Sequence, residues 1–253
     1  MNDLLISLVV FAVIFGGAVL GVVVRPLLSE SHLQPDSKDV VKLATGLIGT
    51  LAALVLGLLI ASAKSSFDQK ASQVRQLTAT IIVLDDLLAQ YGPEAAPVRT
   101  RLRQIIPPLA NRIWHEQESS NGNPGHFESS AESSSFEKEL ERLSPKDDAQ
   151  RSLQSRAIQA FTEAAQTRLL LFTQAGGSIP VPFLIILVFW LSAIFVSLTL
   201  FTPFNLVVMA SLLIGALSFA GAIFLVLELD NPFAGLMGIS SVPLRNALSA
   251  VNS

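Results

Sequence analysis

Four stretches of this chain are long and apolar enough to cross a membrane, at about residues 4–24, 42–63, 183–201 and 206–227. An apolar helix of about 20 residues spans the hydrocarbon core of a bilayer. Most of the charged residues lie between the second and the third stretch, from Lys64 to Arg168. The pattern therefore predicts an all-α membrane protein with four transmembrane helices and a soluble helical domain inserted between helices 2 and 3.

The predicted division of the chain follows these changes in polarity. We expect transmembrane helices 1 and 2 in residues 1–64, a helical cytoplasmic domain in residues 65–177, transmembrane helices 3 and 4 in residues 178–228, and a C-terminal cytoplasmic tail in residues 229–253. Residues 118–135 are rich in Ser, Gly and Asn, which predicts a flexible loop within the soluble domain. The chain begins with Met1-Asn2-Asp3, without the basic residues of a signal peptide, so we interpret its first stretch as a retained helix.

The second stretch continues into the soluble domain without a helix breaker. Beyond Lys64, apolar residues recur three and four positions apart, which gives a helix one apolar stripe. The members of this stripe are Val74, Leu77, Ile81, Leu84 and Leu88. Gly92-Pro93 is the first breaker. We expect a polar connection at residues 26–39, then one long helix that begins near Lys42 in lipid and ends in water at Tyr91.

Two rows of residues on the apolar half of this long helix are candidate functional positions. Small residues recur at every fourth position, which favours close packing of helices in lipid. They are Gly49, Ala53, Gly57 and Ala61, with Thr45 and Ser65 at the ends of the row. The neighbouring row is Thr50, Leu54, Leu58 and Ser62. It is a candidate pore face, because rings of apolar side chains can gate a channel by dewetting; the alternative is that Leu54 and Leu58 pack in the bundle or face lipid.

Other local patterns predict contacts and helix ends. Gly17 and Gly21 form a G-x-x-x-G, which fits packing inside the bundle as well as contact between subunits. A helix at residues 95–117 contains Pro107-Pro108, where we expect a kink or a break. Residues 136–143 predict a short helix, and Ser144-Pro145 predicts the start of a helix that ends near Gln174. In the tail, Pro243 predicts the start of a short helix at residues 244–251.

Three arginines near the start of the helix at residues 95–117 invite two interpretations. Arg99, Arg101 and Arg103 alternate with other residues, so a helix spreads them around its surface. We expect a solvated face there, with contact to a phosphate or a lipid headgroup as the alternative.

The composition gives little support to catalysis or to nucleic-acid binding. The 253 residues are 51% hydrophobic and 15% charged, with a net charge of −3 and no Cys. No basic stripe is present to replace the counterions of nucleic-acid phosphates. His115-Glu116 begins like a zinc-hydrolase motif, but Ser119 stands where the second His is required. We expect no catalytic residue, no metal site, no cofactor and no nucleic-acid partner.

The distribution of basic residues predicts the orientation in the membrane. Four spans place both termini and the large domain on one side. That side carries five Lys or Arg residues near the membrane against three on the other, and such residues favour the cytoplasm. We therefore expect the large domain and both termini to be cytoplasmic.

Two segments resemble the bestrophins. One is Gly57-Leu-Leu-Ile-Ala-Ser-Ala-Lys-Ser-Ser-Phe67, at the junction of the apolar and the soluble parts of the long helix. The other follows the last apolar stretch and contains Glu228, Asp230, Asn231, Pro232 and Phe233, the family signature. The whole chain is also similar to a bacterial family of bestrophin-like four-pass proteins, which implies the bacterial inner membrane.

The resemblance implies a homo-oligomeric, pentameric ion channel whose second helices form an apolar neck around the pore. The neck would fall on Thr50, Leu54 and Leu58. Where the family has an Arg-aromatic pair after helix 2, this chain has Ser66-Phe67. The residues after Phe233 lack the acids that bind calcium in animal members, which argues against calcium gating.

Two functions fit these observations. The first is a bestrophin-like channel for anions or monovalent cations, with copies of the chain, lipid and ions as its partners. The second is a non-conducting membrane scaffold or sensor whose soluble helices bind a partner, and it is favoured by the lack of charged residues within the apolar stretches.

Overall fold

The computed structural model describes residues 3–27, 35–119, 131–173, 179–202, 205–233 and 235–247, and these residues contain helices and turns but no β-strand. Four of the helices are long and apolar enough to span a membrane. The predicted fold class, an all-α protein with four membrane-spanning helices, is therefore confirmed. The chain divides into two compact units, residues 1–66 with 178–230 and residues 67–177 with 231–253.

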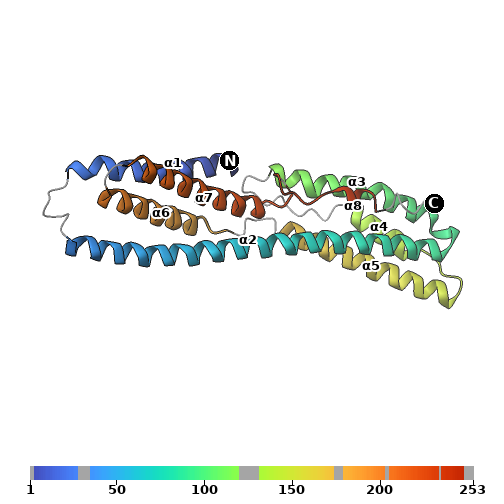
Figure 1. Cartoon of the computed structure of the whole chain (residues 1–253). Coiled ribbons are helices and arrows are strands. Elements are labelled where there is room, and N and C mark those ends of the chain that lie inside the picture. Colours follow the sequence, from blue (N-terminus) through green and yellow to red (C-terminus); the bar gives the residue numbers. More distant parts are fainter. Residues whose placement is uncertain are drawn as a thin grey trace. The chain divides into compact units, whose positions relative to one another are not determined.

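The first unit, called the membrane unit below, contains the apolar helices. Its elements are α1 (Asp3–Val24), the short 3-10 helix η1 (Arg25–Leu27), the first part of α2 (Pro35–Tyr91), α6 (Val181–Phe201) and α7 (Leu206–Asp230). Figure 1 shows α1, α6 and α7 alongside the first half of α2. Helix α1 packs against both α6 and α7.

Glycines bring α1 close to α6. A Cβ atom on Gly17 would lie 3.0 Å from the carbonyl oxygen of Ser192, and one on Gly21 would lie 2.0 Å from Oγ1 of Thr199. Both glycines are buried. The close approach of the two backbones thus requires glycine, which is how small residues stabilise helix pairs in lipid. Of the two interpretations of this G-x-x-x-G, packing inside the bundle is confirmed.

Two polar contacts link other elements of the membrane unit. Arg25 Nη1 donates to the carbonyl oxygen of Thr202 at 2.8 Å, so it satisfies a carbonyl at the C-terminal end of α6. Between α2 and α6, the hydroxyl oxygens of Thr45 and Ser197 lie 2.9 Å apart. In lipid, a hydrogen bond between two hydroxyl groups helps to hold neighbouring helices together.

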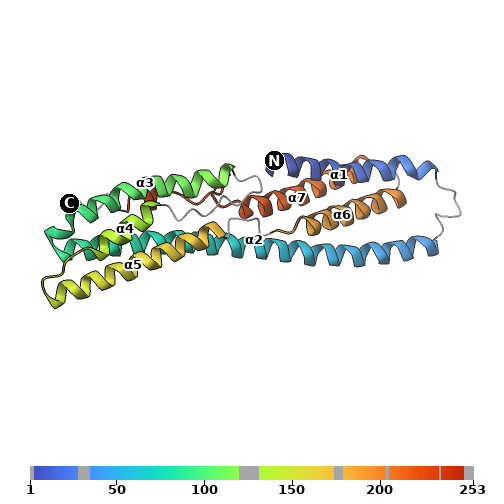
Figure 2. The same ribbon diagram turned by 180° about the vertical axis from the view of Figure 1, so that it is seen from behind.

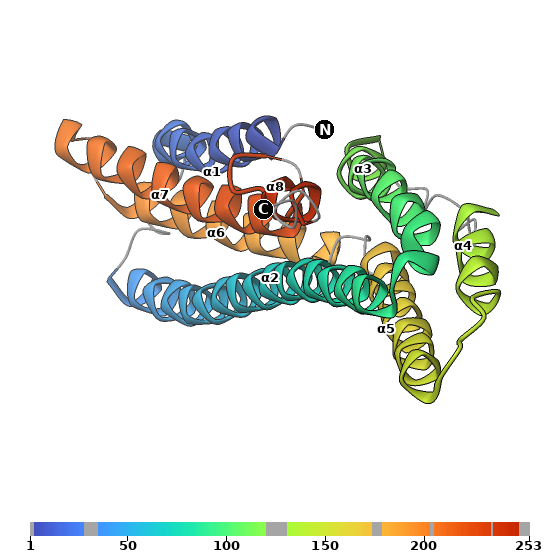
Figure 3. The same cartoon turned by 90° about the vertical axis from the view of Figure 1, so that its right-hand side faces the viewer.

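The second unit, called the soluble unit below, is a bundle around one apolar core. It contains the second part of α2, the 3-10 helix η3 (Pro93–Ala95), α3 (Ala96–Ser119), α4 (Ala131–Glu141), α5 (Asp148–Thr173) and α8 (Val242–Arg245). Figure 2 shows α3, α4 and α5 beside the second half of α2, and Figure 3 shows the chain reversing direction between α4 and α5. The predicted stripe of α2 is at the centre of this core, since all five of its members are buried.

The long helix ends where the sequence predicts. Helix α2 stops at Tyr91, and Gly92 has a φ of +117°, a value that glycine adopts at little cost. It begins at Pro35, however, so the expected connection up to Asp39 is wrong. Proline is favoured in the first turn of a helix, because the N–H that it lacks has no partner there. Pro35 is therefore a start signal that the prediction overlooked.

Two predicted helix starts in the soluble unit are also wrong. Helix α4 begins at Ala131 rather than at residue 136. Helix α5 begins at Asp148, because Asp147 caps it: the backbone N–H of Gln150 donates to Asp147 Oδ1 at 2.7 Å. The expected cap, Ser144, precedes the helix. An aspartate at the N-cap also interacts favourably with the helix dipole, which explains why this later signal prevails.

Helix α3 is not broken at Pro107-Pro108. Both prolines are exposed. Water can therefore reach the carbonyl groups that lose their N–H partners, which lowers the cost of the interruption. At the other end of the chain, α7 continues to Asp230, so Glu228 and Asp230 lie inside its last turn and not after it. The short helix of the tail is α8, which begins at Val242 rather than at residue 244.

Candidate functional site

The candidate pore residues share one exposed face of α2. Successive members of a row spaced by four advance about 40° around a helix with 3.6 residues per turn. Leu54 is 70% exposed and Leu58 is 66% exposed, and Thr50 and Ser62 are exposed as well. In contrast, Ala52, Leu59 and Ala63 on the opposite face of α2 are buried. The membrane half of α2 thus has one face covered by its own chain and one face open.

The hydroxyl group of Thr50 is satisfied within the helix. Its Oγ1 donates to the carbonyl oxygens of Gly46 at 3.0 Å and of Leu47 at 2.8 Å. The surface that it offers outward is therefore the methyl group and the lone pairs of the oxygen. Together with Leu54 and Leu58, it makes a surface without a free hydrogen-bond donor and without charge.

The row of small residues changes its environment along α2. At its start, a Cβ atom on Gly49 would lie 3.9 Å from Cδ1 of Ile194 on α6, so this end packs inside the chain. Ala53, Gly57 and Ala61 are exposed, and a Cβ atom on Gly57 would have no heavy atom within 4 Å. The drift of about 40° per step rotates the row from the covered face to the open face. Three of the four candidate packing residues therefore border the candidate pore row.

The signature residues lie at the end of α7 and in the segment that follows it. In the membrane unit, Glu228 is 4% exposed and Asp230 is half-buried. In the soluble unit, Asn231 is exposed, whereas Pro232 and Phe233 are buried. The carbonyl oxygen of Pro232 accepts a hydrogen bond from the backbone N–H of Ile239 at 2.7 Å, which closes the turn of this segment.

Trp114 on α3 holds this C-terminal segment in place. Its Nε1 donates to the carbonyl oxygen of Ile239 at 2.8 Å, and its ring meets that of Phe233 edge to face at 5.4 Å. Arg245 adds a hydrogen bond to Asn111 Oδ1 at 2.7 Å. The Phe of the signature therefore anchors the segment on α3. The sequence analysis did not predict this role for Trp114. The available signal was the presence of a large aromatic side chain in a largely polar part of the helix.

A buried ion cluster between α2 and α3 was also missed. Asp85 has no exposed side-chain surface, and both of its carboxylate oxygens accept hydrogen bonds from Arg99 at 2.7 Å. Arg103 adds a third contact at 3.4 Å. Burial raises the pKa of Asp85, but the hydrogen bonds and charges of the two arginines outweigh it and hold the pKa below its usual value.

The expected solvated face of α3 is therefore wrong for two of the three arginines. Arg99 and Arg103 are four residues apart on one side of the helix, and this spacing was the available signal. Among the described ranges, no group of three or more His, Asp or Glu side chains is placed to hold a metal ion. The side chains of His115 to Ser119 lie outside the described residues.

The fold and this site define a class: an α-helical integral membrane protein with four spans and a soluble helical unit. The chain belongs to the bestrophin-like family, since the family model for the bestrophin-like domain matches residues 12–244. No curated protein and no solved structure matches the chain. The family and the four apolar helices together indicate a channel-like membrane protein.

Proposed function

We propose that this chain forms a homo-oligomeric ion channel, a pentamer in which the open face of α2 surrounds the pore. One observation carries the proposal: the membrane half of α2 has an open face that is uncharged and continuous from Thr50 to Ser62. Membership of the bestrophin-like family supports the same assignment.

Leu54 and Leu58 form the apolar neck of the proposed channel. Rings of leucine from several copies narrow a pore without binding ions, so that wetting and dewetting control conduction. Thr50 and Ser62 border the neck on either side with hydroxyl groups. Because the neck carries no charge, the proposal covers anions and monovalent cations alike.

Ala53, Gly57 and Ala61 form the proposed contact between neighbouring copies. The lack of large side chains allows two helices to approach closely in lipid, where packing rather than burial from water stabilises association. The open environment of Gly57 supports this role, because it leaves room for the helix of a neighbouring copy to pack against the glycine. Gly49 contributes to packing within each copy.

The proposed orientation has the soluble unit and both termini in the cytoplasm of a bacterial cell. The excess of Lys and Arg on the side of the soluble unit supports it. Cysteine labelling from either side of the membrane would test it, since the natural chain contains no Cys.

Ion flux from liposomes tests the function. The wild-type chain and the double variant Leu54→Ala with Leu58→Ala are reconstituted after their oligomeric state has been confirmed. We expect flux from the wild type and faster flux from the double variant, because a wider neck wets more readily. Opposed KCl gradients then distinguish anions from cations by the sign of the reversal potential.

A matched control replaces two exposed leucines outside the proposed pore, Leu20→Ala on α1 with Leu217→Ala on α7. Its flux should equal that of the wild type. Absence of flux from both the wild type and the neck variant, despite a confirmed oligomer, would overturn the proposal. It would favour the non-conducting scaffold or sensor instead.

A further inference from the structure

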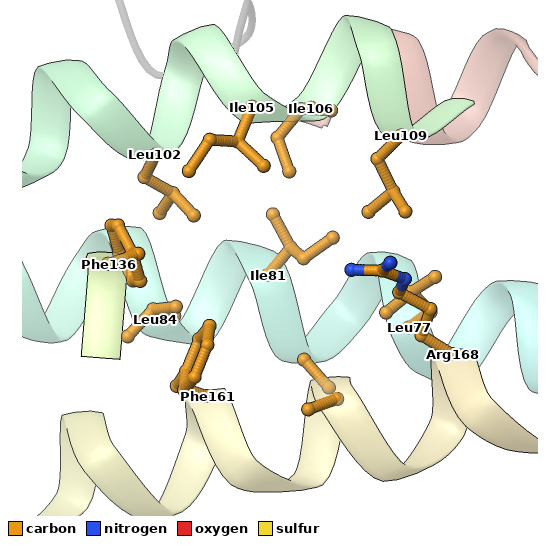
Figure 4. A pocket seen from close by; sticks show the side chains of 12 residues that line it. Leu77, Ile81, Leu84, Leu102, Ile105, Ile106, Leu109, Phe136, Phe161 and Arg168 are labelled. Carbon is orange, nitrogen blue, oxygen red and sulfur yellow. The ribbon is translucent and has the colours of Figure 1, made fainter. Parts of the chain in front are cut away.

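Helix α3 runs antiparallel to the soluble half of α2. Near one end of the pair, Arg99 of α3 contacts Asp85 of α2 at 2.7 Å. Farther along, Leu109 of α3 lies beside Leu77 of α2, and both line one cavity of about 60 Å³ (Figure 4). Trp114 comes five residues after Leu109. It therefore lies at the end of the soluble unit where α2 leaves its apolar stretch.

Helix α5 is antiparallel to α2 in the same way. Gln150 Nε2 donates to the carbonyl oxygen of Tyr91 at 3.0 Å, at the end of α2. Gln76 Nε2 donates to Glu163 Oε1 at 3.1 Å, farther back along α2 and farther forward along α5. Leu170 comes seven residues after Glu163. The last turns of α5 therefore lie at the same end of the soluble unit as Trp114.

The exposed face of α5 changes from polar to apolar toward this end. From Asp148 to Gln166, the exposed residues of α5 are polar or alanine. Leu169 is then 38% exposed and Leu170 is 46% exposed. An apolar turn on a face that is otherwise polar indicates that its surroundings differ from water there.

The C-terminal segment adds apolar side chains to the same end. Trp114 holds this segment through its hydrogen bond to Ile239. In the turn before Ile239, Leu236 is 84% exposed and Met237 is 47% exposed. Only six residues separate Leu236 from Asp230, where the membrane-spanning helix α7 ends.

Large apolar side chains are exposed mainly at this end of the soluble unit. In the described part of this unit, they are Val83, Leu169, Leu170, Leu236, Met237 and Val242. All except Val83 belong to the last turns of α5 or to the C-terminal segment. At the opposite end, the surface carries the ion pair of Lys146 with Glu94. The apolar surface is thus confined to the segments next to the membrane spans.

We propose that an apolar rim, formed by Leu169, Leu170, Leu236 and Met237, docks on the lipid surface at the boundary between headgroups and acyl chains. Lipid is the occupant because both segments of the rim continue into membrane-spanning helices: α5 precedes α6, and the C-terminal segment follows α7. Apolar faces at a membrane surface are buried about 5–10 Å into this boundary. The proposal requires the four spans but not a conducting pore.

Spin labels on single cysteines test the rim in the full chain, which has no natural Cys. Leu170→Cys and Leu236→Cys are labelled in phosphatidylcholine nanodiscs. Oxygen concentrates in the bilayer and a neutral nickel chelate stays in water, so the ratio of their collision rates reports the surroundings. We expect this ratio to be severalfold higher at both positions than at Val83→Cys. Val83 is the matched control, since it is 48% exposed but lies outside the rim.

Quenching of Trp114 by lipids with brominated acyl chains provides a measurement without a label on the rim. A Trp190→Phe background leaves Trp114 as the only tryptophan. We expect quenching in this background and about half as much after Leu170→Gln with Leu236→Gln, because polar side chains weaken docking. Val83→Gln should leave the quenching unchanged. Circular dichroism checks that each variant keeps its helices.

Two results would overturn the assignment. A collision ratio at positions 170 and 236 that equals the ratio at position 83 would mean that the rim faces water. Low collision rates with both reagents would mean that protein, such as another copy of the chain, covers the rim instead of lipid. Absence of ion flux in the liposome experiment would leave these ratios unchanged, so the two proposals fail separately.

Discussion

Leucine side chains lie in different surroundings in the two halves of α2. In the soluble unit, Leu88 is 1% exposed and packs in the core. In the membrane unit, Leu58 on the same helix is 66% exposed. In water such exposure would disfavour the folded chain, but lipid is as apolar as leucine and removes that cost. The comparison shows that the soluble half of α2 is completed by its own chain, whereas the membrane half leaves a face for lipid or for another copy.

The first prediction contrasts one leucine from each half. Leu88→Ala should lower the free energy of unfolding of the soluble unit by about 2–5 kcal/mol, because it leaves a cavity in a closed core. Leu58→Ala should change it by less than about 0.5 kcal/mol, as for other exposed sites. Urea unfolding of the full chain in micelles measures both. A Trp190→Phe background makes the fluorescence of Trp114 report on the soluble unit.

Equal losses from the two substitutions would contradict the comparison. A large loss from Leu58→Ala alone would mean that this leucine has a partner within its own chain. Leu54→Ala, at the other exposed leucine of the neck, repeats the test independently.

The second prediction concerns the ion cluster that the soluble half has and the membrane half lacks. Asp85→Asn should lower the free energy of unfolding at neutral pH by about 1.5–3 kcal/mol, the usual contribution of hydrogen bonds to a charged group. Arg99 and Arg103 are about a quarter to a third exposed, so water limits the loss. Urea unfolding in the same Trp190→Phe background provides the measurement.

The pH dependence of that loss has a definite sign. The pKa of Asp85 is lower in the folded chain than in the unfolded chain. Its contribution is therefore fully present above the unfolded pKa of about 3.9 and is lost as the pH falls through the folded pKa. The variant should thus differ most from the wild type near neutral pH and least in acid. A difference that grew in acid would contradict the assigned ion pair.

The third prediction contrasts two glycines of the membrane unit. A Cβ atom on Gly21 would lie 2.0 Å from Thr199 Oγ1 and 2.6 Å from the carbonyl oxygen of Val196, so Gly21→Ala forces α1 away from α6. We expect the free energy of unfolding of the membrane unit to fall by about 1–3 kcal/mol, as for other overpacked sites. Unfolding in micelles, followed by Trp190 fluorescence in a Trp114→Phe background, measures it.

Gly57→Ala is the matched substitution on the open face of α2. It should leave the unfolding of the single chain unchanged and weaken association between copies. If Gly21→Ala were tolerated and Gly57→Ala unfolded the membrane unit, the assignment of inner and outer packing would be reversed.

The sequence alone predicts the features of this fold that depend on neighbouring residues. The apolar stretches, the stripe on α2 and its end at Gly92 follow from local patterns of polarity and backbone preference. The start of α5 was misplaced because Ser144 and Asp147 are both good caps, and only the structure shows that Asp147 is the one that accepts the hydrogen bond from the backbone N–H of Gln150. The start of α2 at Pro35 could have been predicted from the sequence, since proline is favoured in the first turn of a helix.

Contacts between distant segments were beyond local patterns. Nothing near Asp85 in the sequence predicts its pairing with Arg99 on the next helix, and nothing near Trp114 predicts its hydrogen bond to Ile239. For the candidate site, the sequence predicted the two rows on α2. Only the structure shows that the row of small residues begins on the covered face of α2 and ends on its open face. The pore itself stays a prediction.

The mass of the detergent-solubilised particle tests the central claim, that the open face of α2 is where copies of this chain meet. Native mass spectrometry in a mild detergent measures it without a label. The account predicts a particle of five chains of 27.1 kDa each, which Gly57→Ala shifts toward smaller species. A monomer of 27.1 kDa for the wild type would contradict it, because one four-helix subunit cannot enclose a symmetric pore.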